Sequence, residues 1–188
     1  MVLLKIYKSI GNPSRPLRLF IGGLHGRECR TTKLLLEMLV KTRRPRSGSA
    51  VVIPCLYTGK YVSTLSFNYL NTKAFKRLLK IVEAFKPDVY VEVHCYKTSS
   101  YSSLTSPDRV NVKGIPPLLE VENGVLIGSI SPILKAKLNL DTPILIETPC
   151  GKKENFKTAL KILRVFLNAN STREALEALS FKFKARRV

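Results

Sequence analysis

The apolar and polar positions of the chain follow two periods that alternate along its length. Short apolar runs rich in β-branched residues predict strands over 3–7, 17–21, 50–54, 88–94 and 143–147, and a strand or hairpin over 118–127. Apolar positions repeated every three or four residues predict helices over 28–41, 71–86, 153–167 and 172–179. The serine- and threonine-rich stretch 96–107 predicts a loop.

This alternation of strands and helices is typical of the α/β class. We expect a single domain over 1–188 with a mixed, mostly parallel β-sheet and helices on both faces, because helices that connect parallel strands cover both sides of the sheet. Ligands of such sheets bind beyond the carboxyl ends of the strands. The residues that follow the predicted strands are therefore the first place to search for chemistry.

The balance of charged residues adds a second indication. The 188 residues include 32 lysines and arginines against 13 acidic residues, a formal net charge of +19, while 45% are apolar, as in a globular protein. Such a charge favours a partner of opposite charge, and three classes fit: a nucleic acid, an anionic membrane surface and an acidic small molecule. The stretch 101–150 is close to neutral, so the excess comes mostly from the two ends of the chain and from helix faces.

No stretch of the chain predicts export or membrane insertion. Lys5 interrupts the apolar N-terminus too early for a signal sequence, and no apolar run approaches the ~18 residues of a membrane span. We therefore expect a cytoplasmic protein without a membrane segment, in which cysteines stay reduced. On that expectation the four cysteines are thiols that fill small apolar spaces near one edge of the sheet: Cys29, Cys55, Cys95 and Cys150.

Three predicted strands end in residues that can bind a metal ion or transfer a proton. The strand 17–21 leads to His25 and Glu28 in GGLHGRE, the strand 88–94 ends in His94, and the strand 143–147 ends in Glu147. The chain has no other histidine. Two histidines and a carboxylate, with a fourth position open to water, form a ligand set of catalytic zinc sites. The pattern therefore predicts one Zn²⁺ per chain on His25, Glu28 and His94.

Zinc in such a site lowers the pKa of bound water toward ~7 and polarises a carbonyl, so a separate carboxylate is needed to carry the proton. Glu147 is the candidate for this general base and acid. Glu92 lies two residues before His94, on the same side of a strand, where its carboxylate can orient the imidazole through the other ring nitrogen. An ion pair between Glu92 and a neighbouring base is an equal alternative.

The order of these motifs resembles the zinc carboxypeptidase superfamily, and within it the succinylglutamate desuccinylase and aspartoacylase branch. GGLHGRE is similar to the family's G-x-H-G-x-E, VEVHCY to the strand of the third ligand, and ETP to the end of the catalytic strand. The resemblance covers roughly 17–150 and implies a zinc carboxypeptidase-like (phosphorylase/hydrolase-like) fold, zinc on His25, Glu28 and His94, and catalysis by Glu147. Tyr96 matches the tyrosine of the carboxypeptidase His-Ser-Tyr, which implies contact with the substrate.

The resemblance says less about the substrate. Where the desuccinylase branch has Asp-Leu-Asn-Arg, this chain has YLNT over 69–72, so Asn71 is retained as a substrate contact and one carboxylate-binding arginine is lost. A second family arginine falls near Thr64. Arg27, Lys60 or Lys73 could supply the missing charge. The C-terminal β domain of the desuccinylases has no counterpart, which leaves a catalytic domain similar to small archaeal relatives.

Three functions agree with these observations. The first is a zinc-dependent hydrolase that cleaves an amide or ester bond of a small anionic acyl-amino acid or peptide-like substrate. The second is a catalytically silent relative that binds a metal or an anion. The third is a basic nucleic-acid-binding protein, although the chain has no helix-turn-helix, zinc-finger or RNP motif. The joint placement of His25, Glu28, His94 and Glu147 favours the hydrolase.

Overall fold

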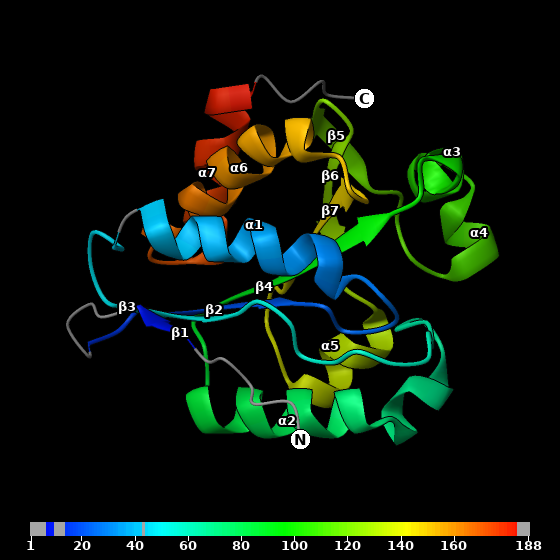
Figure 1. Ribbon diagram of the computed structural model, residues 1–188, viewed down its shortest axis with the longest axis horizontal. Helices are drawn as coiled ribbons and strands as arrows, with labels where there is room; N and C mark the ends of the chain where they lie inside the picture. Colours follow the sequence, from blue (N-terminus) through cyan, green and yellow to red (C-terminus); the bar gives the residue numbers. More distant parts are fainter. Residues whose placement is uncertain (1–6, 10–13, 43, 184–188) are drawn as a thin grey trace.

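The computed structural model describes residues 7–9, 14–42 and 44–183, which contain one sheet of seven strands (Figure 1). The strands lie in the order β1-β3-β2-β4-β7-β6-β5. Their bounds are β1 Tyr7–Ser9, β2 Leu17–Gly22, β3 Ser49–Ile53, β4 Val89–Tyr96, β5 Leu119–Glu122, β6 Val125–Ser129 and β7 Ile144–Pro149. Strands β3, β2, β4 and β7 run parallel, and β1, β6 and β5 are antiparallel to their neighbours. The expected mixed, mostly parallel sheet is confirmed.

Helices cover both faces of the sheet, as the sequence predicts. Helices α1 (Cys29–Thr42), α6 (Phe156–Asn168) and α7 (Thr172–Phe183) lie over one face, and α2 (Lys73–Phe85) and α5 (Pro132–Leu138) over the other (Figure 1). Each face has its own apolar core. Phe20 belongs to the first core and Ile21 to the second, because successive side chains of a strand point to opposite faces.

The boundaries of α2 show how local chemistry defines an element. The helix begins at Lys73 because the Thr72 hydroxyl accepts a hydrogen bond of 3.1 Å from the Phe75 N–H. It ends before Lys86, which takes a left-handed conformation with φ 43°. The hairpin between β5 and β6 turns at Asn123 and Gly124, both with positive φ, so of the two alternatives predicted for 118–127 the structure has the hairpin.

Several short elements differ from the sequence prediction. The stretch 96–107, predicted as a loop, contains the 3-10 turn η2 (Thr98–Ser100) and helix α3 (Tyr101–Thr105), and α4 (Arg109–Lys113) follows. The elements η1 (Phe67–Asn71) and α5 are also absent from the prediction, and the predicted helix 153–167 begins with the 3-10 turn η3 (Lys153–Asn155) before α6. Such short helices hold too few apolar positions for a period to be visible.

The predicted strand 3–7 lies outside the described residues except for its last position, where β1 begins. Within the described ranges, no helix is both long and apolar enough to cross a membrane.

Candidate metal centre

The turn between β2 and α1 brings His25 and Glu28 close to the sheet. A Cβ at Gly22, the last residue of β2, would lie 2.7 Å from Thr32 Cβ, so α1 packs directly on the strand. Gly26 has a φ of +60°, a conformation that residues with a side chain rarely adopt. Because the turn is this tight, Glu28 stands immediately before the first residue of α1 and faces the end of β4.

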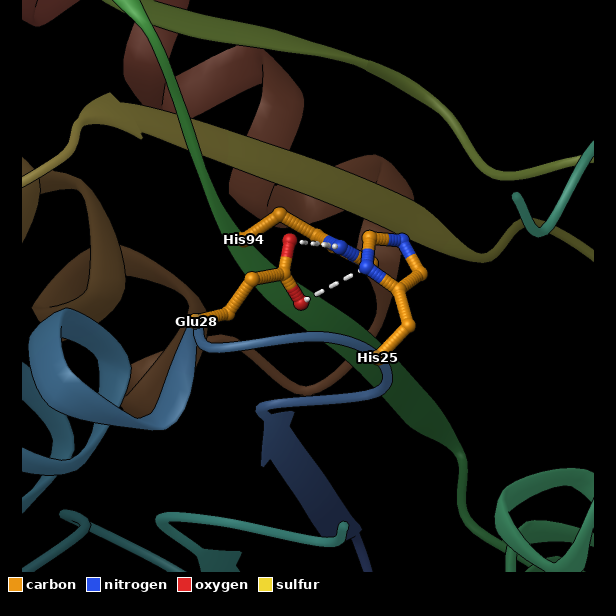
Figure 2. Close-up of side chains that lie close together, drawn as sticks. All are labelled: His25, Glu28 and His94. Carbon is orange, nitrogen blue, oxygen red and sulfur yellow. Dashed lines mark hydrogen bonds and ion pairs between the residues drawn. The ribbon is translucent and has the colours of Figure 1, made fainter. Parts of the chain in front are cut away.

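His25, Glu28 and His94 converge at this point (Figure 2). Nδ1 of His94 is 3.0 Å from Oε1 of Glu28, and Nδ1 of His25 is 3.3 Å from Oε2 of the same carboxylate. All three residues are buried, and their candidate ligand atoms lie within 4.8 Å of one another. Two ligands of a tetrahedral zinc ion, each bound at ~2.1 Å, are about 3.4 Å apart, which is close to these spacings.

Two atoms of this cluster lack a hydrogen bond. Nδ1 of His25 and Oε2 of Glu28 are buried, and among the described residues neither has a hydrogen-bond partner. They approach within ion-pair distance of each other but not in hydrogen-bonding geometry. Buried polar atoms without a partner are destabilising and rare. A metal ion would satisfy both atoms at once, so this donor set fits a metal.

The pKa values of the cluster suit this interpretation. Burial lowers the pKa of His25 to about 4, and the nearby His94 adds to the effect, so the His25 imidazole is neutral at pH 7. Burial alone would also lower the pKa of His94, but Glu28 and Glu92 outweigh it and hold that pKa well above its usual value. Burial opposes ionisation of Glu28, yet its contacts with His94 lower its pKa. The contacts with Glu28 and Glu92 therefore favour the protonated form of His94.

Glu92 contacts His94 from the side opposite Glu28. Its Oε2 lies 3.2 Å from His94 Nε2, and its Oε1 accepts a hydrogen bond of 2.8 Å from the Tyr90 hydroxyl. These residues alternate along β4, so their side chains share one face of the sheet. In the described part of the chain, Glu92 forms no ion pair with a lysine or arginine. The carboxylate therefore holds the ring nitrogen that faces away from the candidate metal position.

Glu147 lies beside His94 on the neighbouring strand. The two residues are register partners in the parallel pairing of β4 with β7. Oε2 of Glu147 is buried and has no hydrogen-bond partner among the described residues. Burial raises the pKa of Glu147 to about 7, with His94 and Arg109 opposing the rise and Glu28 adding to it. A carboxyl group with this pKa can both accept and return a proton near neutral pH.

A cavity of about 980 Å³ contains these groups and has the size of a small-molecule site. The charged residues that line it include more bases than acids. The bases are Arg27, Arg30, Lys60, Lys97 and Arg109, and the acids are Glu28, Glu92 and Glu147. Because Glu28 and Glu92 are occupied with His94, the charge that remains toward a ligand is mainly positive.

The predicted substrate contacts are only partly brought to this cavity. Arg27 lines it with an exposed side chain, and so does Lys60. Tyr96 lines it too, but its hydroxyl donates a hydrogen bond of 2.6 Å to the Gly124 carbonyl. Asn71 is exposed at the end of η1 and does not line the cavity. The structure therefore does not bring Asn71 to the cluster, although the motif places it there.

Tyr61 and Arg109 are among the cavity residues that the sequence prediction does not include. The Tyr61 ring packs edge-on against His25 with centroids 4.6 Å apart, and it is 62% exposed at the cavity. Arg109, the first residue of α4, lines the cavity and is buried. Arg109 stands in no motif or periodic segment, so the sequence holds no signal for it, whereas Tyr61 ends the stretch VVIPCLYTGKY, which is similar to the family strand that leads to the substrate loop.

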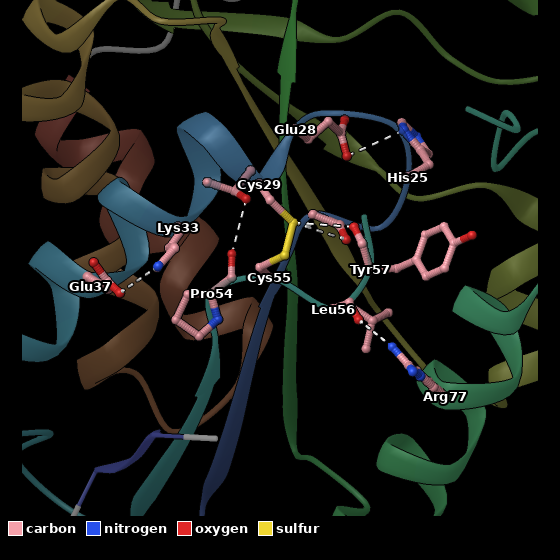
Figure 3. Close-up of a disulfide and its surroundings, with 12 residues drawn as sticks. His25, Glu28, Cys29, Lys33, Glu37, Pro54, Cys55, Leu56, Tyr57 and Arg77 are labelled. Carbon is pink, nitrogen blue, oxygen red and sulfur yellow. Dashed lines mark hydrogen bonds and ion pairs between the residues drawn. A yellow bond between two sulfur atoms is a disulfide. The ribbon is translucent and has the colours of Figure 1, made fainter. Parts of the chain in front are cut away.

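The four cysteines form two disulfides, and the prediction of free thiols is wrong. Cys29 is bonded to Cys55 and Cys95 to Cys150, which leaves no free cysteine. Figure 3 shows the first bridge, which joins the start of α1 to the chain after β3, close to Glu28. Both bridges lie at the carboxyl ends of the parallel strands, where the cysteines were expected. The thiol prediction rested on an expected compartment and not on geometry.

Comparison with known proteins identifies the family. Residues 13–187 match the family described as an uncharacterized protein conserved in archaea (DUF2119). The chain belongs to this archaeal family. An uncharacterized protein of Methanocaldococcus jannaschii is 39% identical over 184 residues, which cover 95% of this chain and 89% of that relative. These matches confirm the archaeal part of the expectation.

One solved structure is also similar to this DUF2119 chain. An aspartoacylase family protein from Mesorhizobium loti aligns over 94% of the chain with a TM-score of 0.48 and 15% sequence identity. The chain spans about half of that protein, 55% of its length. The resemblance to the desuccinylase and aspartoacylase branch rests on the motifs of the DUF2119 chain itself.

Proposed function

We propose that this protein is a zinc-dependent hydrolase that cleaves an amide or ester bond of a small anionic substrate, such as an acyl-amino acid. The main support is the convergence of His25, Glu28 and His94, whose candidate ligand atoms lie within 4.8 Å of one another in a cavity that also contains Glu147. These four residues, in the same order along the chain, also carry the resemblance to the zinc carboxypeptidases.

The protein side chains prepare this site for a metal ion. Zinc held by His25, Glu28 and His94 would acidify water and polarise the carbonyl of the substrate. His25 is neutral at pH 7 and offers an unpaired Nδ1. Glu92 holds Nε2 of His94, which keeps the Nδ1 of that ring directed toward Glu28.

Glu147 is the group that moves protons in this proposal. With a pKa near 7, it accepts a proton from water in the cavity at neutral pH and returns it to the leaving nitrogen or oxygen. Its unpaired Oε2 is available for this transfer. The register pairing of Glu147 with His94 fixes the carboxyl group beside the cluster, so no large motion is needed to reach it.

Zinc content and turnover test the proposal separately. The purified wild type should hold about one zinc ion per chain, and Glu28→Gln, which removes the anionic ligand with little change in shape, should lose it. Zinc-loaded wild type should hydrolyse members of a panel of N-acyl amino acids, short peptides and esters. Glu147→Gln should keep the zinc and lose activity by roughly 100-fold or more.

Glu154→Gln is the matched control, because Glu154 is an exposed glutamate whose contact with Lys152 lies at the surface. It should keep both zinc and activity. Zinc binding without turnover of any substrate would identify a catalytically silent relative. Failure of the wild type to bind zinc would overturn the proposal.

A further inference from the structure

The outer side of α2 carries a stripe of basic residues. The apolar positions of this helix pack into the core under the sheet, and the side that faces solvent repeats a base every three or four residues. We call the four exposed residues the α2 basic stripe: Lys73, Lys76, Arg77 and Lys80. In the part of the chain that the structure describes, none of the four forms an ion pair.

The charges of α2 lie where they destabilise the helix. Lys73 is its first residue and Lys76 its fourth, close to the partial positive charge of the helix N-terminus, whereas Glu83 lies in its last turn. Both arrangements oppose the helix dipole. The spacing of the stripe also places bases three or four residues apart, where like charges repel each other. Helix stability therefore gives no reason for the stripe, and an external anionic partner does.

Helix α7, which is of similar length, shows the ordinary arrangement of charges. Glu174 lies in its first turn and Lys182 in its last turn, as the helix dipole favours. Arg173 pairs with Glu177 one turn further on, at 3.0 Å. A high proportion of bases in the whole chain therefore does not by itself produce a helix such as α2.

The composition of the surface separates three kinds of anionic partner. No large apolar side chain of α2 is exposed, so the helix has nothing to insert into a membrane. Lysine is depleted in interfaces between proteins, whereas interfaces with nucleic acids are polar and strongly positive. Helix α5, which packs against α2 on the same face of the sheet (Figure 1), adds the exposed Lys135 and Lys137. A nucleic acid is thus the partner that this surface fits.

We infer that the α2 basic stripe binds the sugar–phosphate backbone of a nucleic acid, independently of its base sequence. The seven residue steps from Lys73 to Lys80 span about 10 Å along the helix axis, which is the length of about three phosphate charges of one strand. Lysine meets a phosphate as a point charge, and such contacts position a nucleic acid without reading its bases. This binding needs neither zinc nor turnover, so it goes beyond the proposed hydrolase.

The salt dependence of binding to a labelled DNA duplex of about 25 base pairs and random sequence tests the inference. The wild type should bind at about 50 mM salt, as measured by fluorescence anisotropy. Joint replacement of Lys73, Lys76 and Lys80 by glutamine should weaken binding at least about tenfold. The slope of log K against log salt should become shallower by about 2 to 3, because each lost phosphate contact removes about 0.9. Single-stranded RNA of the same length is the second probe, with a change of about 2 in the slope.

The matched control replaces three exposed lysines on the other face of the sheet by glutamine: Lys41, Lys157 and Lys182. Both triple variants lower the formal net charge of +19 by three, so they differ only in position. The control should bind as the wild type does. Glu83→Gln, which removes the only acid of α2, should tighten binding. The α2 triple variant should be at least as stable to heat as the wild type, because it removes charges that oppose the helix dipole.

Three results would overturn the inference. The wild type does not bind either nucleic acid at about 50 mM salt. The two triple variants weaken binding equally, which would show a response to net charge and not to this surface. Vesicles of anionic lipid, or polyglutamate, bind the wild type more tightly than nucleic acid does, and lose that binding in the α2 triple variant. Because none of these measurements depends on zinc or hydrolysis, failure of the hydrolase proposal would leave them unchanged.

Discussion

Replacing Cys95 and Cys150 together by serine should destabilise the protein by about 4 kcal/mol. The bridge closes a loop of 55 residues. A cross-link over this length removes about 14 cal/mol/K of entropy from the unfolded chain, which amounts to about 4 kcal/mol at 25 °C. Cys150 is exposed, and its N–H keeps a hydrogen bond of 2.9 Å to the Tyr96 carbonyl. The folded state therefore changes little, and the loss comes from the unfolded chain.

The second bridge provides a matched comparison. Cys29 and Cys55 are 26 residues apart, and the same relation gives about 3.5 kcal/mol for the double serine variant. Guanidinium unfolding of the wild type and both variants measures these losses. Heating should give the same order, with the midpoint of the Cys95/Cys150 variant roughly 8–16 °C below that of the wild type. Wild type in strong reductant should lose about 7–8 kcal/mol, because the two bridges lie in separate loops.

Two results would refute this reasoning. Four reactive thiols in denatured, unreduced protein would show that the bridges do not exist. If the bridges are present but reductant leaves the free energy of unfolding unchanged, loop closure in the unfolded chain is not what they contribute.

Three further predictions concern the cluster and its support. Zinc uptake at pH 7 should release more than one proton, because zinc displaces the proton favoured on His94 by its neighbouring carboxyl groups and also lowers the pKa of Glu147, which is near 7 without metal. Calorimetry in buffers of different ionisation enthalpy measures the release, and zinc affinity should fall with falling pH because protons compete with the metal for His94. In metal-free protein labelled with ¹³C-glutamate, the Glu147 carboxyl should titrate near pH 7, and bound zinc should lower its pKa. The rate of hydrolysis should fall as the pH drops below the pKa that Glu147 has in the zinc-loaded protein, because the carboxyl then becomes protonated. Gly22→Ala should cost about 1–3 kcal/mol in chemical unfolding and weaken zinc binding, because the new methyl group would meet Thr32 and displace α1.

The sequence predicts the sheet and the cluster of His25, Glu28 and His94 because both depend on local patterns. The apolar runs identify the parallel strands, and the polar residues at their ends must meet at one edge of a parallel sheet. His25, Glu28 and His94 were assigned in this way, and the structure brings them together. Glu147 joins them because its strand pairs directly with that of His94.

Features that depend on long-range packing were not predictable. The disulfides require Cα–Cα distances of 5.1 and 4.9 Å, which arise only from the order of β3, β2, β4 and β7. The inward direction of Arg109 depends on how a five-residue helix docks, which its own sequence does not determine. For Asn71 the motif predicts more than the structure shows. Its match to a family pattern predicts a contact with the substrate, but the 3-10 turn η1 leaves Asn71 exposed and away from the cavity.

The Cys95–Cys150 bridge also has a consequence for the integrity of the chain. A protease that cuts the backbone anywhere between these cysteines leaves one covalently joined molecule, with the β4 and β7 segments still tethered beside His94 and Glu147. The helices α3 and α4 lie in that interval. Because the disulfide joins the ends of β4 and β7, the segment with α3 and α4 can change in length or sequence during evolution without separating these two strands. The part of the chain that carries Arg109 can thus diversify between relatives while the candidate metal ligands and the neighbouring carboxyl of Glu147 stay together.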